Sequence, residues 1–409
     1  MPDATTVLEK DRQDPLKAFR ERFVLPDGVI YLDGNSLGVL PAGMSRRIAE
    51  VVEREWGERL VRGWNDAGWI DLPARVAGKI ARLVGAGDGT VAVGDSTSVN
   101  VFKTLSAALA LRPDRRVILS DSNNFPTDLY IADGLARLIG QGYELRTAMA
   151  ADMDDAIDAS VAAVLLTEVD YRTGWRYDMA QTTRRIHAAG ALAIWDLCHS
   201  AGAFPVHLEE ADADFAIGCG YKYLNGGPGA PAFLYVAPRH LEGIRPALSG
   251  WMGHQAPFAF TADYAPAEGI ARMTVGTPPV LSMSALDAAL DAFDGVDMEL
   301  VRAKSQDLCD LFIAEVEAHC PELELVTPRE RSQRGSQVSF RHPEGYAIMQ
   351  ALIAEGVIGD FRAPDILRFG MTPLYLSHGD VARAAEILGR IMGEKRWDRP
   401  EFRTRAKVT

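Results

Sequence analysis

The sequence contains no long hydrophobic run and few cysteines. Because no stretch of about 18 consecutive apolar residues occurs in the chain of 409 residues, a membrane-spanning helix is not expected. Four cysteines in a chain of this length do not indicate a disulfide framework, and the absence of a CxxC pair argues against a zinc site. The cysteines are therefore expected to be small buried hydrophobic residues. They are Cys198, Cys219, Cys309 and Cys320.

An apolar leader and an excess of basic residues are lacking as well. The first residues carry acids and bases instead of the apolar core of a signal peptide, so we expect a cytoplasmic protein with no membrane partner. The 43 lysines and arginines are outnumbered by 56 aspartates and glutamates, and the formal net charge is -13. This charge argues against a nucleic-acid-binding surface. It does not exclude a small anionic ligand, because a local cluster of donors can bind phosphate on an acidic protein.

Strand-like and helix-like segments alternate over most of the chain. Such alternation predicts an α/β protein with a mostly parallel sheet and helices on both faces. In sheets of this kind, ligands bind beyond the carboxyl ends of the strands. Apolar runs typical of strands lie at residues 90–93, 117–120, 161–166, 191–195, 215–219 and 232–236.

The spacing of apolar residues and the position of proline predict the helices. Pro41 is expected to begin a helix, because proline is tolerated in the first helical turn. Four apolar residues follow at spacing four on one face: Ile48, Val52, Trp56 and Leu60. From about residue 282, a second alternation of helices and strands indicates a smaller α+β domain.

Polar side chains follow several of the predicted strands. They are the run Asp95 to Asn100, then Thr167, Asp196 and Lys222. Because the carboxyl ends of parallel strands meet at one edge of a sheet, these groups are expected to form one site. The run that contains Thr97 and Ser98 offers hydroxyls and free backbone N–H groups to an anion. Taken alone, the same run is more typical of an ordinary helix N-cap.

Lys222 and Asp196 together indicate a particular cofactor chemistry. A lysine amine forms a Schiff base with pyridoxal phosphate, and an aspartate pairs with the protonated pyridine nitrogen. A lone lysine would be read as a solvated surface residue, since lysines are mostly exposed. The combination of a lysine just past one strand with a carboxylate at the end of another favours the cofactor site.

Two motifs carry a resemblance to a known family. Asp196-x-x-His199 and the run from Gly220 through Lys222 to Gly229 resemble the kynureninases, which are fold-type I, aspartate-aminotransferase-like pyridoxal phosphate enzymes. The resemblance implies a hydrolase that cleaves the Cβ–Cγ bond of L-kynurenine to give anthranilate and L-alanine in tryptophan catabolism. It leaves open whether 3-hydroxykynurenine is also a substrate.

The resemblance also implies a fold and a division of the chain. We expect a large domain at residues 46–281 with a mostly parallel seven-stranded sheet, and a small α+β domain at residues 282–409. An N-terminal segment, residues 1–45, is expected to pack with the small domain. A homodimer with shared active sites is expected, because Trp251 and Thr277 come from the neighbouring subunit in the family.

The roles implied by the family fall on named residues of this chain. The catalytic residues are Lys222, Tyr221 and Asp196. The cofactor-binding residues are Thr97, Ser98, Phe125, Asp128, Thr167, Asp196, His199, Tyr221, Lys222, Trp251 and Thr277. The substrate-binding residues are Arg368, Trp64 and Asn65.

Chemical reasons support several of these assignments. A guanidinium fork such as that of Arg368 suits a carboxylate better than a lysine does, although a surface ion pair is the simpler reading of a single arginine. Tyr221 adjoins Lys222 and is the expected proton carrier, but it would need a lowered pKa to ionise. Asp128 is unexpected beside a phosphate, because two anions repel.

Other readings of the sequence remain open. A cysteine desulfurase or selenocysteine lyase on the same fold would need a mobile, reactive cysteine. Cys309 and Cys320 lie instead in or at the end of a long helical pattern. A non-catalytic cofactor-binding regulator would carry a DNA-binding domain, and the charge of this chain argues against one.

Overall fold

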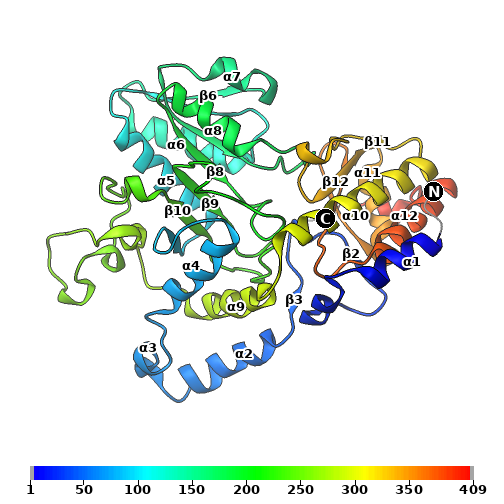
Figure 1. The fold of residues 1–409 in the computed structure, drawn as a ribbon, viewed down its shortest axis with the longest axis horizontal. Helices are drawn as coiled ribbons and strands as arrows, with labels where there is room; N and C mark the ends of the chain where they lie inside the picture. The colour runs from blue at the N-terminus through cyan, green and yellow to red at the C-terminus, as the bar shows by residue number, and fades with distance from the viewer. Residues whose placement is uncertain (1–3, 406–409) are drawn as a thin grey trace. The chain divides into compact units, whose positions relative to one another are not determined.

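The computed structural model describes residues 4–405, which form two compact units (Figure 1). The residues up to Ala42, the segment Tyr171–Arg176 and the residues from Asp291 onward form one unit, here called the small unit. Gly43–Asp170 and Tyr177–Leu290 form the other, here called the large unit. Among residues 4–405, no helix is long and apolar enough to cross a membrane.

A seven-stranded sheet is the centre of the large unit, as predicted (Figure 1). The pairings that join β9, β8, β7, β5 and β6 are parallel, whereas β10 runs antiparallel to both of its neighbours. In spatial order the strands are β4 (Val91–Val93), β10 (Phe233–Val236), β9 (Phe215–Gly218), β8 (Leu192–Asp196), β7 (Val161–Thr167), β5 (Val117–Asp121) and β6 (Glu144–Ala148).

Helices cover both faces of this sheet because the side chains of each strand alternate. Ile194 of β8 belongs to the core cluster that it forms with Leu105 of α5 (Thr97–Leu111) and Leu135 of α6 (Pro126–Ile139). The next residue, Trp195, points the other way and donates to Thr183 Oγ1 of α8 (Met179–Ala188) at 3.1 Å. Helices α5 and α6 therefore share one face, and α8 lies on the other.

The predicted helix at Pro41 begins later than expected. Pro41 lies in β3 (Leu40–Pro41), which pairs with β1 (Phe23–Val24), and α2 (Met44–Glu50) begins after Gly43. Gly43 has φ +86°, a backbone conformation that an L side chain rarely adopts, so the chain turns there before the helix. A π-helical turn, Val51–Trp56, follows α2.

The remaining regular elements of the large unit are short or lie near α4. Helix α4 (Leu72–Leu83) packs against β4 and α9 (Val280–Leu290). Helices α3 (Gly63–Asp66) and α7 (Met153–Ala156) each form one turn. Five 3₁₀ turns lie at Leu60–Arg62, Ala150–Asp152, Pro238–His240, Trp251–Gly253 and Pro257–Ala259, and a sixth at Gly269–Met273.

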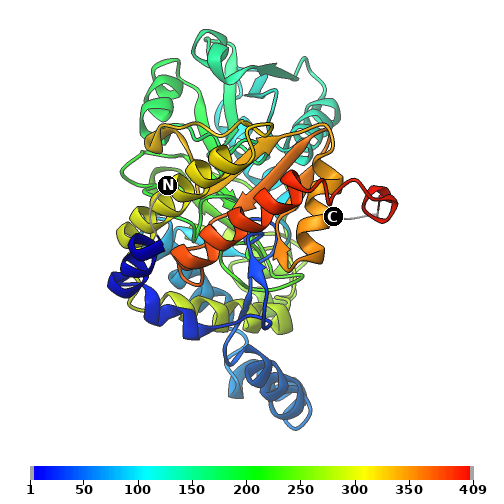
Figure 2. The ribbon, with the colours of Figure 1, turned by 90° about the vertical axis from the view of Figure 1, so that its right-hand side faces the viewer.

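The small unit is built on a four-stranded antiparallel sheet. Helix α10 (Met298–His319) packs against α12 (His378–Gly393) (Figure 2). Phe312 of α10 contacts the rings of Phe340 and Phe369 in the sheet. In spatial order the strands are β11 (Glu324–Leu325), β12 (Gln337–Arg341), β15 (Ile366–Gly370) and β14 (Asp360–Arg362).

The first residues of the chain complete the small unit. Strand β2 (Ile30–Tyr31) pairs in parallel with β13 (Val357–Ile358), and α1 (Ala4–Gln13) contacts α12. The other helices are α11 (Gly345–Ala354) and α13 (Pro400–Arg403), with 3₁₀ turns at Lys17–Arg22, Asp291–Phe293 and Arg331–Gln333.

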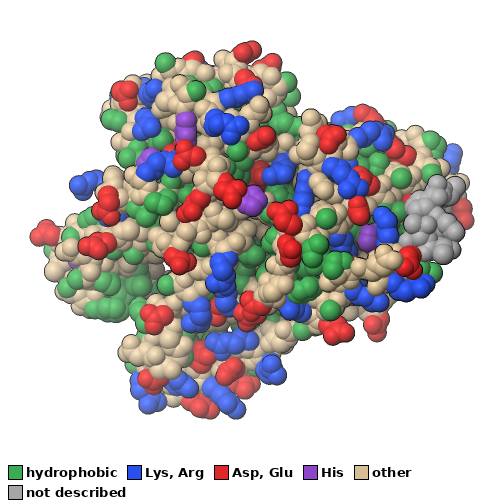
Figure 3. Space-filling model, viewed as in Figure 1, with side chains coloured by type: hydrophobic (Ala, Val, Ile, Leu, Met, Phe, Trp, Pro, Cys, Tyr) green, Lys and Arg blue, Asp and Glu red, His purple; other side chains and the backbone are tan. Residues whose placement is uncertain are grey.

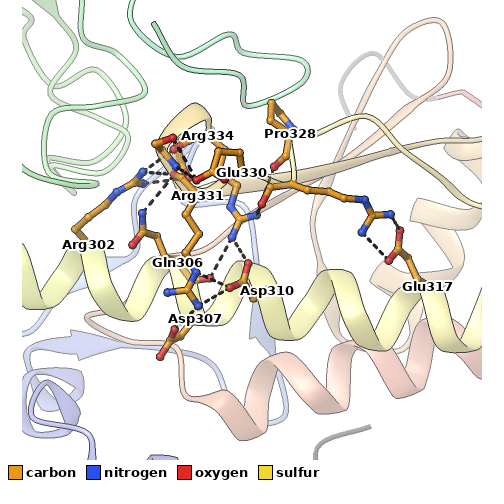
Figure 4. A network of polar contacts seen from close by, with 12 residues as sticks. Arg302, Gln306, Asp307, Asp310, Glu317, Pro328, Glu330, Arg331 and Arg334 are labelled. Atoms are coloured by element: carbon orange, nitrogen blue, oxygen red, sulfur yellow. Dashed lines mark hydrogen bonds and ion pairs between the residues drawn. The ribbon is translucent and has the colours of Figure 1, made fainter. Parts of the chain in front are cut away.

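A polar network holds the loop before β12 against α10 (Figure 4). Arg334 is buried, and it donates to the backbone O of Arg329 at 2.8 Å and to the carboxylate of Asp310. Arg302 donates to the backbone O of Arg331 and of Arg334, each at 2.8 Å. The loop therefore has a defined position on the helix.

The same loop binds the segment Tyr171–Arg176. The backbone N–H of Gly335 donates to Gly174 O at 2.8 Å, and Thr327 Oγ1 donates to Thr173 O at 2.6 Å. A Cβ on Gly174, which has φ +75°, would lie 2.8 Å from Gln337 Cγ, so only glycine fits there. This segment of the chain is thus built into the small unit.

Candidate active site

Lys222 lies in a tight turn that joins β9 to β10. The backbone N–H of Asn225, at φ +58°, donates to Lys222 O at 2.9 Å. The N–H of Gly226 donates to Gly220 O at 2.9 Å. A Cβ on Gly220 would lie 2.4 Å from Pro231 O, so the glycine permits this close approach. The turn thereby places the lysine just past the end of β9.

The structure brings His199 directly to Lys222. Lys222 Nζ lies 3.1 Å from His199 Nε2. A lysine ammonium can only donate, so the imidazole nitrogen accepts this hydrogen bond. Asp196 is the last residue of β8, it is buried, and its Oδ1 accepts from the backbone N–H of Cys198 at 2.7 Å. His199 thus contacts the amine of Lys222.

The surroundings of Lys222 favour its cationic form. Burial by itself lowers the pKa of the ammonium, but the charges of Cys219, Cys198, Tyr221 and Asp196 outweigh burial and raise the pKa above its ordinary value. The lysine must lose this proton before it can act as a nucleophile. His199 Nε2 is placed to accept that proton.

Asp128 faces Asp196 in the interior of the large unit. It belongs to the first turn of α6 and is 2% exposed. Burial, and after it the charge of Asp196, raise the pKa of Asp128 well above its ordinary value. Two carboxyl groups in contact cannot both ionise easily, so one proton is held between them. Asp128 is thus placed beside the aspartate expected at the pyridine nitrogen.

These carboxyl groups fit pyridoxal phosphate. Asp128 Oδ2 is buried and has no hydrogen-bond partner among the described residues. A protonated pyridine nitrogen would supply a donor and a positive charge to such a pair. The cofactor also requires a lysine amine, and Lys222, in contact with His199, supplies one in the same unit.

A cavity of about 1080 Å³ lies in the large unit and is lined by several predicted residues. Thr97, Tyr221 and Thr277 line it, together with Ser96 and the buried Lys103. Thr97 begins α5, so free backbone N–H groups of the helix are available to an anion. Its position suits a phosphate group.

The start of α5 confirms the N-cap reading of this junction. Ser96 is the N-cap, and its side chain accepts from Val99 N at 3.3 Å. Thr97 Oγ1 lies 3.8 Å from Cys198 Sγ, which joins the start of α5 to the turn that carries Asp196 and His199. Ser98 is half-buried in the first turn.

Tyr221 is not ionised by its surroundings. Burial raises the pKa of the phenol above its ordinary value, and Lys222 opposes that increase without cancelling it. The residue is partly buried and lines the cavity. In this state Tyr221 can donate its proton but is a poor base.

Among the described residues 4–405, eleven of the fourteen predicted site residues lie outside the lining of this cavity, Lys222, Asp196 and His199 included. Trp64 stacks edge-on against Trp69, with 5.8 Å between ring centroids, and Asn65 is exposed. Phe125 and Trp251 are 42% and 38% exposed. The exposure of these rings leaves them accessible to a ligand or to another chain.

Thr167 is held by a residue that the sequence reading did not single out. Its hydroxyl donates to Asn124 Oδ1, which also accepts from the backbone N–H of Phe125 at 2.7 Å. A sequence signal for Asn124 exists, since asparagine often bonds the backbone beside it where a helix begins with proline.

The small unit contains a second polar cluster around Arg368. The arginine is 1% exposed. Its Nε donates to Asp360 Oδ1 at 2.8 Å, its Nη2 to Ser36 Oγ at 2.7 Å and its Nη1 to Tyr171 O at 2.7 Å. Arg362 Nη2 lies 2.6 Å from Asp360 Oδ2. Arg368 is therefore not a surface ion pair.

This cluster has more positive than negative charge near neutral pH. Burial first, and then the charge of Asp360, raise the pKa of Asp33 to about 7. When Asp33 is protonated, two guanidinium groups face the single carboxylate of Asp360. The remaining positive charge favours an anion such as a carboxylate.

The cysteines of α10 lack the properties of a reactive thiol. Cys309 and Cys320 are buried. Burial raises the pKa of Cys309 to about 11 and that of Cys320 to about 12. Thiols of this kind are inert, because the thiolate is the nucleophile.

Comparison with known proteins agrees with this chemistry. Residues 301–388 match the kynureninase C-terminal domain family. A kynureninase of Burkholderia pseudomallei (strain K96243) is 53% identical over 409 residues, 98% of each chain. The kynureninase of Deinococcus radiodurans is 57% identical over 391 residues, 94% of this chain and 95% of its own. The chain belongs to the kynureninase family. This membership confirms the family, the enzyme class and the pyridoxal phosphate cofactor predicted from the sequence.

Solved structures similar to this kynureninase-family chain confirm the fold. A cysteine desulfurase from Thermococcus onnurineus NA1 superposes with a TM-score of 0.78 at 18% identity, covering 93% of this chain and 99% of its own. The cysteine desulfurase CsdA of Escherichia coli gives 0.77 at 20% identity, with 93% and 98% covered. At such low identity the similarity shows the aspartate-aminotransferase-like fold type I and not the reaction.

Proposed function

We propose that this chain hydrolyses L-kynurenine to anthranilate and L-alanine. The observation that carries the proposal is the contact of Lys222 with His199 beside the buried Asp196, in a chain that matches kynureninases over nearly its whole length. Pyridoxal phosphate supplies the electron sink that lets bonds to the substrate α- and β-carbons break. The chain's own residues bind, orient and move protons.

Residues of the large unit would hold the cofactor. Lys222 would bind its aldehyde carbon, and Asp196 and Asp128 its ring nitrogen. Thr97, Ser98 and Tyr221 would bind the phosphate, since Thr97 and Tyr221 line one cavity next to the start of α5. Thr277 would bind the phosphate held by the neighbouring subunit. Phe125 and Thr167 would contact the ring of the cofactor. His199 would contact Lys222, and Trp251 would lie on the phosphate side.

Lys222 and Tyr221 would carry the protons of the reaction. Once its amine is free and neutral, Lys222 would remove the α-proton of the substrate, and His199 at 3.1 Å would relay that proton. Tyr221 would donate a proton to the β-carbon of the substrate as the Cβ–Cγ bond breaks, because a phenol with a raised pKa is protonated at neutral pH. This donor role does not require Tyr221 to ionise in advance.

Arg368 would bind the α-carboxylate of the substrate. Its guanidinium is fixed by Asp360, Ser36 and Tyr171 O, so it is oriented before an anion arrives. The second guanidinium, of Arg362, leaves the cluster positively charged while Asp33 is protonated. Trp64 and Asn65 would contact the aryl ring and decide between kynurenine and 3-hydroxykynurenine.

A homodimer with shared sites is part of the proposal. Trp251 forms an exposed aromatic patch with Phe258 and Phe260, at 5.6 and 6.3 Å between ring centroids. Exposed apolar patches of this kind are typical of contact surfaces. In the dimer, Trp251 and Thr277 would serve the site of the neighbouring subunit.

A domain division and a location complete the proposal. The N-terminal segment, residues 1–45, would pack with the small domain, and residues 46–281 would belong to the large one. Residues 282–290 lie in α9 of the large unit, so the small domain would begin near Asp291. The enzyme would work in the cytoplasm, which fractionation of cells that produce the chain would test.

Product analysis tests the reaction directly. Purified protein with pyridoxal phosphate and L-kynurenine should release anthranilate, measured by fluorescence, and alanine in equal amounts. A parallel assay with 3-hydroxykynurenine ranks the two substrates. If neither substrate is cleaved while cysteine is desulfurated, the reaction is that of the fold neighbours and the proposal is wrong.

A further inference from the structure

One buried amide links two of the residues assigned to the cofactor. Asn124 is 6% exposed and lies between β5 and α6. Its Oδ1 accepts from the backbone N–H of Phe125 at 2.7 Å and from the hydroxyl of Thr167. Its Nδ2 lies 3.0 Å from Ser120 Oγ and 3.4 Å from Leu165 O. The amide thus joins the end of β5, the start of α6 and the end of β7.

The orientation of this amide follows from its partners. A backbone N–H can only donate, so the atom that faces Phe125 N must be the carbonyl oxygen of Asn124. A carbonyl oxygen can only accept. The hydroxyl of Thr167 must therefore give its single hydrogen to Asn124. Thr167 Oγ1 is left with acceptor lone pairs alone for any further partner.

Ser120 supports the same orientation from the other side. Its hydroxyl donates to Leu165 O at 2.6 Å, so its oxygen is free to accept from Asn124 Nδ2. All of these groups are buried, where an unpaired polar atom costs the most. Rotation of the amide would break the bonds to Phe125 and Thr167 together, so the arrangement has one low-energy state.

Thr167 stands next to the cofactor residues. It is the last residue of β7, and it pairs in register with Asp196, the last residue of β8. Thr167 lies two residues after Leu165, and Asp196 lies two residues after Ile194. Because side chains two apart in a strand point the same way, both residues face α5 and α6. Asp128 of α6 lies on this face as well.

We propose that Asn124 is a positioning residue that makes Thr167 an acceptor toward the cofactor and fixes the backbone of Phe125. The inference rests on the proposed cofactor site. Without Asn124, the Thr167 hydroxyl could turn and donate, and the N–H of Phe125 would lose its partner. The cofactor group that donates a proton to Thr167 Oγ1 would then lose its acceptor, so the protonated form of that group would be less favoured.

Cofactor binding to the apoprotein tests the positioning role without turnover. Pyridoxal phosphate titrated into apoprotein, followed by tryptophan fluorescence, should bind about tenfold more weakly to Asn124→Ala, since a buried hydrogen bond is worth about that much. Asn123→Ala is the matched control, because Asn123 is an exposed neighbour whose side chain touches only Met149 Sδ, at 3.8 Å, among the described contacts. It should bind like the wild type.

A double-mutant cycle separates positioning from general loosening. Thr167→Val should weaken binding, and adding Asn124→Ala to it should weaken binding much less than Asn124→Ala does alone. The visible absorbance of the bound cofactor should titrate at a shifted pH in Asn124→Ala and in Thr167→Val, but not in Asn123→Ala. Independent, multiplicative effects or an unshifted titration would overturn the proposal.

Two further results keep the test decisive. If Asn124→Ala does not fold, Ser120→Ala removes the support of the amide and should shift affinity and titration in the same direction, by about two- to fivefold. No shift there overturns the role. Wild-type apoprotein that fails to bind pyridoxal phosphate would instead overturn the cofactor site itself, whereas normal wild-type binding with unaffected variants overturns only the role of Asn124.

Discussion

At the scale of single residues, the two buried carboxyl groups of Asp128 and Asp196 are expected to have different tasks. The pKa of Asp128 is raised well above its ordinary value by burial and by Asp196. An asparagine resembles a protonated carboxyl group, so Asp128→Asn should reduce kcat by no more than about tenfold. Asp196→Asn removes the charge expected at the pyridine nitrogen and should reduce kcat by about a hundredfold or more.

Steady-state anthranilate release measures both variants. Pyridoxal phosphate content should be determined in parallel, so that loss of cofactor is not mistaken for loss of catalysis. A larger loss in Asp128→Asn than in Asp196→Asn would reverse the assignment of the two carboxyl groups.

The raised pKa of Asp33 should make substrate binding depend on pH. Its pKa is raised from 3.8 to about 7, so the residue is neutral below that pH and ionised above it. Ionisation cancels the net positive charge around Arg368. The KM for kynurenine should therefore rise as pH increases through about 7, and Asp33→Asn should flatten this rise.

The same shift has a consequence for stability. The native state holds the proton of Asp33 more tightly than the unfolded state, so its contribution to the free energy of unfolding is lost as pH rises from 3.8 to about 7. Asp33→Asn should have a higher Tm than the wild type at pH 8, and the difference should shrink at pH 4. An equal difference at both pH values would contradict the assigned pKa.

At the scale of elements, the apolar runs of the sequence predicted most strands of the large sheet. The predicted strand at 161–166 is β7, and the run from Asp95 to Asn100, typical of a helix N-cap, opens α5. Strand β6 was not predicted, because Glu144–Ala148 has no apolar run and lies at the sheet edge, where both faces are partly exposed. The apolar stripe from Val52 to Leu60 is exposed, so spacing alone did not show where it faces.

The sequence predicted only some of the contacts in the site. The strand-end rule predicted the positions of Asp196 and Lys222. It could not predict that Asp128 meets Asp196, because that contact depends on how α6 lies over β8. Nor could it predict the pairing of Arg368 with Asp360, which depends on the register of β14 and β15.

The loop network of Figure 4 gives a stability prediction for one element. Arg334 is buried and its partner Asp310 is partly exposed, so Arg334→Met leaves mainly the backbone carbonyls of the loop without donors. It should lower the free energy of unfolding by about 2 kcal/mol. Arg329→Ala, which breaks an exposed pair with Glu317, should change it by about 1 kcal/mol or less.

Urea unfolding followed by circular dichroism distinguishes these two variants. Equal losses would mean that the buried arginine does not hold the loop.

At the scale of the whole molecule, surface charge and exposed aromatic rings suggest different things about partners. On the face shown in Figure 3, acidic and basic side chains are interspersed, so no extended basic surface for nucleic acid is present there. The aromatic patch around Trp251 is the feature that suggests a second copy of the chain.

Mixed subunits test whether Trp251 acts across a dimer. Lys222→Ala and Trp251→Ala chains should each be nearly inactive. After the two are unfolded and refolded together, half of the dimers should be hybrids with one complete site, so about a quarter of the wild-type activity should return. No recovery in a mixture shown to contain hybrids would place Trp251 in the site of its own chain.

Lys222 is the residue proposed to bind pyridoxal phosphate covalently. Borohydride reduction of the loaded protein, followed by proteolysis and mass spectrometry, should find a pyridoxyl group on the peptide that contains Lys222, and Lys222→Ala should carry none. A pyridoxyl group on Lys103 or another lysine, with Lys222 unmodified, would contradict the account.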